Sequence, residues 1–314
     1  SVKVHLALFT VSLIYGGTFS IAKEVMPAFE SKRIRQFKIS LQDAMGDRVL
    51  EWMNANQGVS NPNPLNLRRG ELIGYRLSSG KKISGTANNI GVAISIWSTI
   101  VYFPVAHWVF YFGNKVGDTL TGAGFLAGKG LEDFAGGTAV HINAGAAGLA
   151  LAIVLGRRIG WRKENMRPHS LPLVLLGSGL LWFGWFGFNA GSALAANGIA
   201  ALAFINTQVA TGAALIGWLV LEKIRDGHAT SLGAASGAVA GLVAITPACA
   251  FVAPWAAVVI GFIAGVLCAL AVGLKFKFNF DDSLDVVGVH LVGGLWGSLS
   301  IGFFGSKVIN SVGI

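Results

Sequence analysis

Two histidines are the ionisable residues of this sequence best placed to do chemistry inside a membrane. His141 lies in the apolar segment GGTAVHINAG, and His290 lies in the similar segment DVVGVHLVGG. Ionisable side chains at membrane depth are rare and usually face a bundle interior or a water-filled cavity. A neutral imidazole offers one hydrogen-bond donor and one acceptor. Either histidine alone could be a hydrogen-bonded core residue, but the two similar settings favour a shared functional role.

A metal site and nucleophilic catalysis are two alternatives for this pair. A metal ion needs a third or fourth ligand, and His107 lies near the end of its own apolar run. Asp133 and Asp285 lie at expected helix beginnings, where a carboxylate is more often an N-cap. The sequence has no GxSxG motif typical of a hydrolase. We therefore expect no metal, no cofactor and no enzymatic activity, and the pair instead indicates a pore.

The composition places these histidines in a polytopic membrane protein. Of the 314 residues, 53% are hydrophobic and only 12% are charged, and 43 are glycines. Soluble domains carry about 25% charged residues. The net charge of +9 is spread over short loops, so it indicates membrane topology rather than nucleic-acid binding. Cys249 and Cys268 lie in apolar context and are expected to be unpaired core thiols.

Membrane-spanning helices must position the histidines, and seven apolar runs after residue 90 qualify. A span requires roughly 20 apolar residues. No charged residue lies between Arg167 and Glu222, which leaves room for two helices and a turn. We expect an all-α bundle of about seven such helices plus one N-terminal span. The seven runs are 91–112, 136–155, 171–189, 201–221, 232–246, 254–274 and 286–304.

The loop charges test this number of spans independently, because Lys and Arg gather in cytoplasmic loops. Basic residues occur in every second loop after residue 155, and the intervening loops around 195–200 and 247–254 carry none. We therefore expect a multi-pass plasma-membrane protein with the basic loops inside and residues 113–132 outside. The basic residues are Arg157, Arg158, Arg162, Lys163, Arg167, Lys223, Arg225, Lys275 and Lys277.

The first 90 residues differ in kind from the rest. Residues 1–30 include the apolar run 4–22, which predicts an N-terminal span of uncertain origin. A secretory signal is the alternative, but no convincing cleavage site follows the run. Residues 31–90 are more polar and predict a cytoplasmic insert or linker, with apolar residues at helical spacing near Leu41–Met53. The transmembrane domain is expected to occupy residues 91–314.

Glycines spaced every four residues indicate close helix packing. Such spacing lets the backbones of neighbouring helices approach within a membrane. Tight contacts of this kind would leave only a narrow conduit through the bundle. The glycines are Gly187, Gly191, Gly233, Gly237, Gly241, Gly261, Gly265, Gly293 and Gly297.

Three long segments resemble the ammonium transporter family, which includes methylammonium permeases and Rhesus proteins, and they are most similar to actinobacterial members. The segments are DFAGGTAVHINAGAAGLA, GWFGFNAGSALAANGIAALAFINT and DDSLDVVGVHLVGGLWG, and the resemblance covers about residues 94–305. It implies an eleven-helix bundle that forms homotrimers in the bilayer, with one hydrophobic pore per subunit. It also implies an internal repeat of opposite topology, with one pore histidine in each half.

The resemblance also implies roles for particular residues. The paired pore histidines of the family fall on His141 and His290. The external site that recruits ammonium, an aromatic ring with a hydroxyl, falls on Phe110 and Ser192. Many family members have Trp where this chain has Phe110, so the ring face is kept without the indole N–H.

Three further residues match the family's pore. Phe188 falls on the inner gating phenylalanine, Trp185 lines the vestibule, and Asp133 is the acidic residue that supports recruitment. Ammonium would be recruited outside, lose a proton, and pass the two histidines as ammonia. Either aromatic residue alone would more simply be a core or lipid-facing side chain.

The sequence also departs from the family pattern. The first three family helices are not recognisable in residues 1–90, and the eleventh helix would lie beyond Ile314. We therefore expect the chain to lack these four helices. The alternative to transport is a non-conducting, truncated or fused transporter-like membrane protein, and an intramembrane metalloenzyme is a third hypothesis.

Overall fold

The structure is a computed structural model that describes residues 75–76, 82–83, 94–116, 119–158, 160–163, 168 and 170–310. The N-terminal span expected in residues 1–30 lies outside the described residues. So does most of the insert expected in residues 31–90, and the division of the chain at residue 90 stays a prediction. Tyr75–Ile83 and Ser95–Ile314 belong to one compact unit, which carries the seven expected spans.

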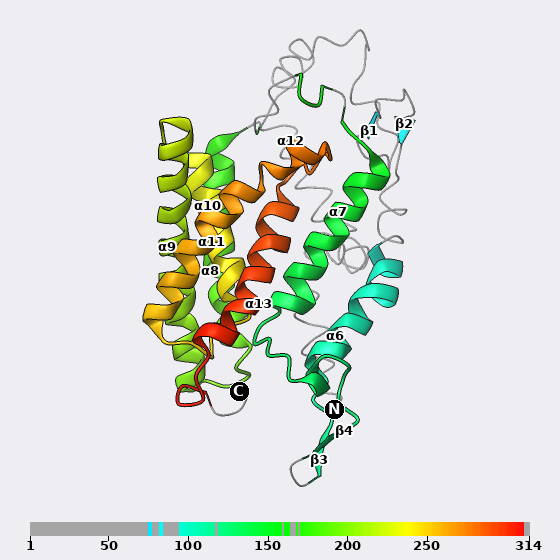
Figure 1. The fold of residues 1–314 in the computed structure, drawn as a ribbon, viewed down its shortest axis with the longest axis vertical. Helices are drawn as coiled ribbons and strands as arrows, with labels where there is room; N and C mark the ends of the chain where they lie inside the picture. Colours follow the sequence, from blue (N-terminus) through cyan, green and yellow to red (C-terminus); the bar gives the residue numbers. More distant parts are fainter. Residues whose placement is uncertain are drawn as a thin grey trace, which may run out of the picture. The chain divides into compact units, whose positions relative to one another are not determined.

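The transmembrane part of this unit is helical, as the sequence predicts (Figure 1). Two shorter apolar helices, Ile94–Phe110 and Ser231–Ile245, complete the seven expected spans. Their order and approximate bounds follow the seven apolar runs of the sequence. Within the described part of the chain, five helices are long and apolar enough to cross a membrane: Gly137–Leu155, Leu171–Gly191, Gly198–Asp226, Pro254–Phe278 and Val287–Phe304.

Several of these spans are composite. A π-helical turn precedes the α-helix in three of them, and a short helix follows α11 in another. The elements are η1 (Ser98–Tyr102), α6 (Phe103–Phe110), η3 (Gly137–Ile142), α7 (Asn143–Leu155), α8 (Leu171–Gly191), α9 (Gly198–Asp226), α10 (Ser231–Ile245), α11 (Pro254–Ala271), α12 (Leu274–Phe278), η4 (Val287–Leu291) and α13 (Val292–Phe304).

Polar residues mark where three of the helices begin. The side chain of Asn197 accepts a hydrogen bond from the backbone N–H of Ala200 at 3.0 Å. The hydroxyl of Thr230 does the same for Gly233 at 2.8 Å, and Ser170 caps α8. Such N-caps satisfy amides that have no partner inside the helix.

Two short antiparallel hairpins accompany the helices. Strands β1 (Tyr75–Arg76) and β2 (Lys82–Ile83) form one, and β3 (Asn114–Val116) pairs with β4 (Thr119–Thr121) in the other. The second hairpin lies in the connection that leaves α6, which continues through the 3₁₀ turn η2 (Ala127–Lys129).

The bundle is organised around α9, which packs against α8, α10 and α11. Helix α13 packs against α10, α11 and η3, while α7 packs against η4. In the view of Figure 1, α13 lies between the α8–α11 group and the pair formed by α6 and α7. This arrangement brings the two histidine-bearing turns, η3 and η4, next to each other.

Glycines make the closest helix contacts, which confirms the close-packing interpretation at most of the predicted positions. A Cβ added at Gly261 or Gly265 would overlap the backbone carbonyl of Ala210 or Ala214 on α9. On α13, Gly297 stands against the backbone of α10 in the same way. At Gly187 and Gly191 a Cβ would meet nothing within 4 Å among the described residues, so close packing at these two positions stays a prediction.

The connection between α10 and α11, which the sequence predicts as an external loop, is buried over most of its length. Residues 246–252 are all buried. Their backbone is held from α9 by Asn206, whose amide donates to the carbonyls of Cys249 and Val252, each at 2.8 Å. Cys249 and Cys268 are free and buried, as expected.

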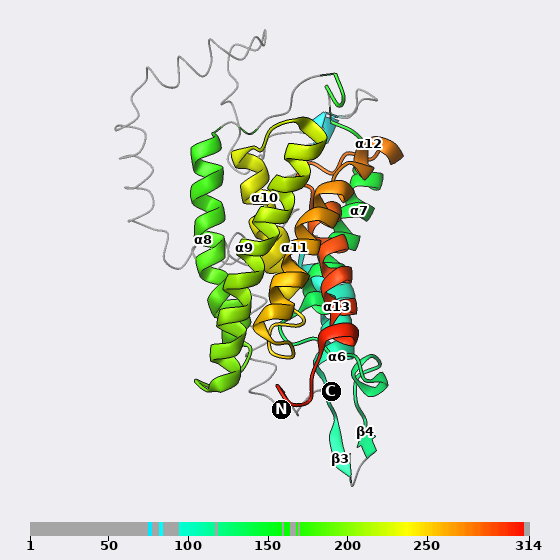
Figure 2. The same cartoon turned by 60° about the vertical axis from the view of Figure 1, so that its left-hand side comes forward.

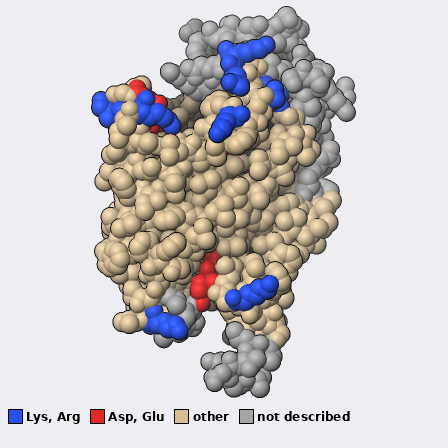
Figure 3. Space-filling view, in the orientation of Figure 1, with Lys and Arg blue, Asp and Glu red and all other residues tan. Residues whose placement is uncertain are grey.

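Charged residues lie mainly toward the two ends of the face seen in Figure 3, with an uncharged zone between them. The end of α7, the α9–α10 junction and α12 lie at the same end of the bundle in both ribbon views (Figures 1 and 2). Arg157 and Arg158 follow α7. The basic pair Lys223 and Arg225 lies in the last turn of α9, and Lys275 and Lys277 lie in α12. These basic residues therefore share one end, as those of alternate loops in a multi-pass protein should.

Candidate functional site

The two histidines meet inside the bundle. Nδ1 of His290 lies 3.3 Å from Nδ1 of His141, and the ring centroids are 5.4 Å apart. His141 is buried, with 1% of its surface exposed, and His290 is partly buried. The sequence segments GGTAVHINAG and DVVGVHLVGG therefore converge on a single site.

A hydrogen bond between two Nδ1 atoms makes the two rings unlike. One ring carries its proton on Nδ1 and donates it, while the other accepts. In two neutral rings, the donor ring then has a bare Nε2, and the acceptor ring has an Nε2–H. Nε2 of His141 is buried and has no hydrogen-bond partner within the described part of the chain. A buried polar atom without a partner costs about 1–3 kcal/mol, so this position favours a small polar guest.

Both histidines lie in π-helical turns that open an α-helix. His141 belongs to η3 and His290 to η4, and each turn runs directly into the next α-helix. Single π-helical turns inside helices are rare and occur frequently at functional sites. The local backbone thus repeats around the two imidazoles.

An aspartate caps each of these turns, eight residues before its histidine. The carboxylate of Asp133 accepts four backbone N–H bonds, from residues 136 to 139, at 2.6–3.1 Å. The carboxylate of Asp282 accepts two, from Val286 at 3.0 Å and Val287 at 2.7 Å. Burial raises the pKa of Asp133, and the four amide hydrogen bonds oppose part of that rise.

The sequence prediction that Asp285 caps the last span is wrong, because Asp282 does so. Asp285 has a positive φ of 58° and lies within the loop that leads into η4. Its carboxylate pairs with the ammonium group of Lys275. The cap at Asp133 is confirmed.

Two aromatic rings stand against His141. The ring of Trp185 stacks on it at 5.2 Å with an interplanar angle of 19°, and the ring of Phe188 lies 6.1 Å away. Trp185 and Phe188 themselves form an edge contact at 5.7 Å. Both aromatic residues are buried on α8, so the His141 ring has a largely apolar surround.

A series of buried hydrogen bonds holds the aromatic side chain of Trp185 in place. The indole N–H of Trp185 donates to the hydroxyl of Thr246 at 2.9 Å. That hydroxyl lies 3.2 Å from the carbonyl oxygen of Asn189, whose amide donates to Thr207 at 2.9 Å. Asn189, Thr207 and Thr246 were not among the predicted site residues, although each is a polar residue in or next to an apolar run. Buried polar groups must be satisfied, and that requirement is the signal that could have found them.

The expected recruitment residues, Phe110 and Ser192, belong to helices that pack against different elements. Phe110 ends α6, which packs on η1, η2 and η3. Ser192 follows α8, which packs on α9 and α10, and its hydroxyl donates to the carbonyl of Phe188 at 2.8 Å. Their pairing at one ammonium site stays a prediction.

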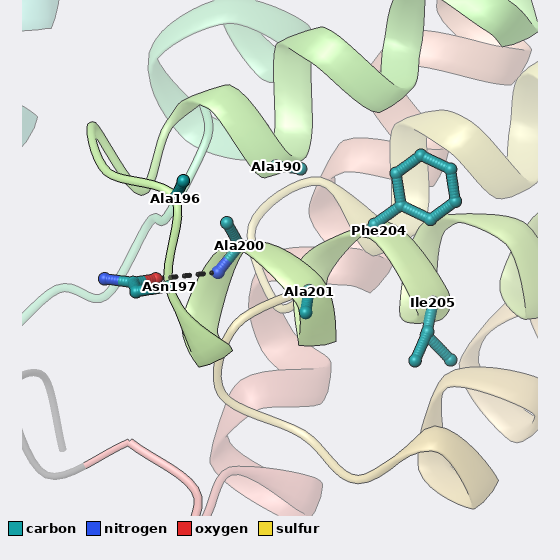
Figure 4. A pocket seen from close by; sticks show the side chains of 7 residues that line it. All are labelled: Ala190, Ala196, Asn197, Ala200, Ala201, Phe204 and Ile205. Atoms are coloured by element: carbon teal, nitrogen blue, oxygen red, sulfur yellow. Dashed lines mark hydrogen bonds between the residues drawn. The ribbon is translucent and has the colours of Figure 1, made fainter.

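A shallow hollow of about 470 Å³ lies beside the end of α8, away from the histidines. Seven residues of α8, α9 and their connection line it, and Asn197 is its only polar side chain (Figure 4). The Asn197 side chain is occupied in capping α9. This hollow has the apolar character of a lipid-facing surface and no chemistry of its own.

Comparison with known proteins gives consistent results. The model of the Ammonium Transporter Family matches residues 77–313. An ammonium transporter of Mycobacterium tuberculosis is 64% identical over 208 residues, covering 66% of this chain and 43% of that protein. One from Bacillus subtilis is 49% identical over 219 residues, covering 69% of this chain and 51% of that protein.

Solved structures give the same result for the fold. The crystal structure of Saccharomyces cerevisiae Mep2 is similar with a TM-score of 0.62 and 39% identity, covering 71% of this chain and 48% of that one. Candida albicans Mep2 gives a TM-score of 0.64 at 36% identity, covering 71% of this chain and 48% of that one. The chain spans about half the length of the curated relatives it matches.

Proposed function

The chain belongs to the ammonium transporter family as a multi-pass protein of the plasma membrane, and we propose that it conducts ammonium, as ammonia, past His141 and His290. The observation that carries the proposal is the contact between the two imidazoles inside an apolar, aromatic surround. One buried ring nitrogen there has no partner among the described residues.

The energetics favour the neutral molecule as the species that passes. Moving a bare ion into an apolar channel costs nominally tens of kcal/mol at low dielectric. Ammonium has a pKa roughly two units above neutral, so removing its proton costs about 3 kcal/mol. Ammonia can then exchange hydrogen bonds with the free ring positions of His141 and His290, which offer a donor and an acceptor.

Other residues take the family's supporting roles in this proposal. Phe110 and Ser192 recruit ammonium at the outer mouth, where a cation–π contact gives about 0.5–2 kcal/mol. Phe188 gates the entrance to the histidines, and Trp185 lines the vestibule. Asp133 supports this end by holding the start of η3.

The assembly is part of the proposal as well. The partners are the lipid bilayer, the ammonium substrate, and two further copies of the chain in a homotrimer. Contacts between copies would cover apolar side chains such as Phe183 and Leu180 on α8, which are 76% and 64% exposed in the single chain. Measuring the oligomeric mass in detergent tests this part.

Flux of ammonium into proteoliposomes tests the transport. We expect His141→Ala to reduce the flux at least tenfold. A positioned side chain that exchanges protons with its substrate typically contributes a factor of about 10² or more to a rate. We expect Ser192→Ala to raise the half-saturating concentration with a smaller effect on maximum flux. His107→Ala is the matched control, because His107 stacks on Tyr111 away from the pair and is exposed.

The outcome separates the two main hypotheses. Flux that exceeds empty liposomes and depends on His141, but not on His107, supports the pore. Flux equal to that of empty liposomes would favour the alternative, a non-conducting transporter-like membrane protein.

A further inference from the structure

One ion pair joins the two halves of the histidine site at the end of the bundle. The guanidinium of Arg158 holds the carboxylate of Asp281 through Nε at 2.8 Å and Nη2 at 2.7 Å. The backbone N–H of Arg158 donates to the same carboxylate at 2.7 Å. The Asp281 side chain is 1% exposed and that of Arg158 is 26% exposed. This bidentate geometry is the strong and directional form of an Arg–carboxylate contact.

Each partner of this ion pair connects directly to one histidine. His141 lies in η3, which continues without a break into α7, and α7 ends at Leu155 shortly before Arg158. On the other side, Asp281 is followed by Asp282, whose carboxylate caps the turn that carries His290.

The same two elements also touch along their length. Helix α7 packs on η4, and Gly145 allows this because a Cβ there would overlap the backbone of Leu291. These contacts fix the distance between the two elements along their length. The bidentate ion pair adds a directional contact at one end, which constrains their axial register.

We propose that Arg158 is a positioning residue: its contact with Asp281 sets the register of α7 against η4 and so keeps the two Nδ1 atoms of His141 and His290 within hydrogen-bond distance. The inference rests on the proposed function, since it explains how the conducting geometry is held. In this proposal Arg158 acts through the two elements it joins and not on the substrate.

Neighbouring contacts support this reading of the segment before η4. Lys275 donates to the carboxylate of Asp285 and, at 3.3 Å, to the carbonyl of Asp282. Arg157 donates to the carbonyl of Asn279 at 3.2 Å. Burial alone would raise the pKa of Asp281, but the hydrogen bonds from Arg158 lower it below its ordinary value. The approach to η4 is thus anchored mainly by charges.

Transport kinetics provide the first test. We expect Arg158→Gln to lower the maximum ammonium flux roughly tenfold, because misplacing reacting groups by about 1 Å can cost a factor of 10². The half-saturating concentration should stay within about twofold, because recruitment at the outer mouth does not depend on this contact. Arg158→Lys should restore part of the flux, since it keeps the charge but loses the bidentate geometry.

Arg225→Gln is the matched control. Arg225 also forms a bidentate contact with an aspartate, its neighbour Asp226, in an exposed pair on α9. Its remaining hydrogen bond goes to the carbonyl of Ala269 on α11 at 3.0 Å, and so to neither histidine segment. The flux of Arg225→Gln should equal that of the unmodified chain. Unchanged maximum flux in Arg158→Gln, or an equal loss in Arg225→Gln, would overturn the proposal.

Hydrogen exchange in lipid nanodiscs provides a second test that does not depend on transport. In Arg158→Gln, the amides of residues 282–291 should exchange roughly tenfold faster, because their cap is no longer held in place. The amides of residues 133–142 should change less than about twofold, and Arg225→Gln should alter neither segment. Equal changes in both segments, or none in either, would contradict the positioning role. If the unmodified chain shows no flux, the proposed function fails and the exchange result alone decides the inference.

Discussion

The two histidine segments, residues 133–141 and 282–290, use the same local device but are anchored differently. Both begin with a capping aspartate and end with a histidine in a π-helical turn. The first is held from the interior, by stacking of Trp185 on His141 and by the backbone of Pro247, whose carbonyl accepts from Phe134 at 3.1 Å. The second is held from the end of the bundle, by Arg158 and Lys275.

This difference shows that a repeated site need not have repeated supports. The first cap satisfies four amides and the second only two. Among the described residues, no ion pair reaches the cap of η3. Packing therefore fixes the first histidine, whereas charge fixes the second. Substitutions that affect one mode of support should leave the other segment intact.

Removing the caps should give the largest effect. Asp133→Ala leaves four amides without their acceptor, and we expect it to lower the free energy of unfolding by about 4 kcal/mol. Asp282→Ala leaves two, and about 2 kcal/mol is expected. Unfolding in mixed micelles, followed by tryptophan fluorescence, measures both. Equal losses would break the comparison between the caps.

Separating the segments should give the next largest effect. Gly145→Ala places a Cβ against the backbone of Leu291, and overpacking of this kind costs about 1–3 kcal/mol. We also expect the ammonium flux to fall, because His290 is carried by the displaced turn. Gly184→Ala is the matched control, because a Cβ there meets nothing within 4 Å on α8. Loss of flux in the control, or full flux in Gly145→Ala, would contradict the assignment.

Lowering the pH should have the smallest effect on stability, but it should distinguish the two modes of support. The pKa of Asp281 is lowered below 3.8 in the folded protein, where burial opposes but Arg158 and nearby Lys275 outweigh it. Its ionised form therefore stabilises the fold above pH 3.8, and this contribution is lost as the pH falls through the lowered pKa. The thermal midpoint of Asp281→Asn should lie below that of the unmodified chain at neutral pH, and the gap should narrow below pH 3.8.

Asp133 should show the opposite dependence. Because burial raises its pKa above 3.8, ionisation of this carboxylate opposes folding, and stability contributed by protonation increases as the pH falls toward 3.8. As the pH falls, the thermal midpoint of the unmodified chain should therefore rise relative to the midpoint of Asp133→Asn. Parallel pH profiles for the two variants would remove the distinction between support by packing and support by charge.

The sequence was sufficient to predict the spans and the histidines, because both depend on local information. Apolar runs of the length of a bilayer specify helices, and an ionisable residue within such a run stands out. The cap at Asp133 followed from its place ahead of a helix. In DSLDVVG two aspartates compete for the same role, and only the backbone conformation at Asp285, with its positive φ, decides for Asp282.

The supports of the site could not be predicted, because they depend on contacts between distant residues. Trp185 and Thr246 are 61 positions apart, and Arg158 and Asp281 are 123 apart. The charge-free connection at 247–254 was predicted only as an external loop. Residues 246–252 are buried, and Asn206 satisfies two of their carbonyls from another helix, which no local pattern reveals.

The glycine contacts between α9, α10 and α11 have a mechanical consequence. Carbonyl oxygens of α9 lie where side chains would stand at Gly261 and Gly265 of α11, and Gly241 of α10 abuts the same stretch. Helices interlocked in this way cannot slide or rock against one another without opening voids, and dense interiors resist such voids. We therefore expect these three helices to stay fixed relative to one another during a transport cycle, as one rigid unit. Motion should then be confined to side chains and to the transported molecules.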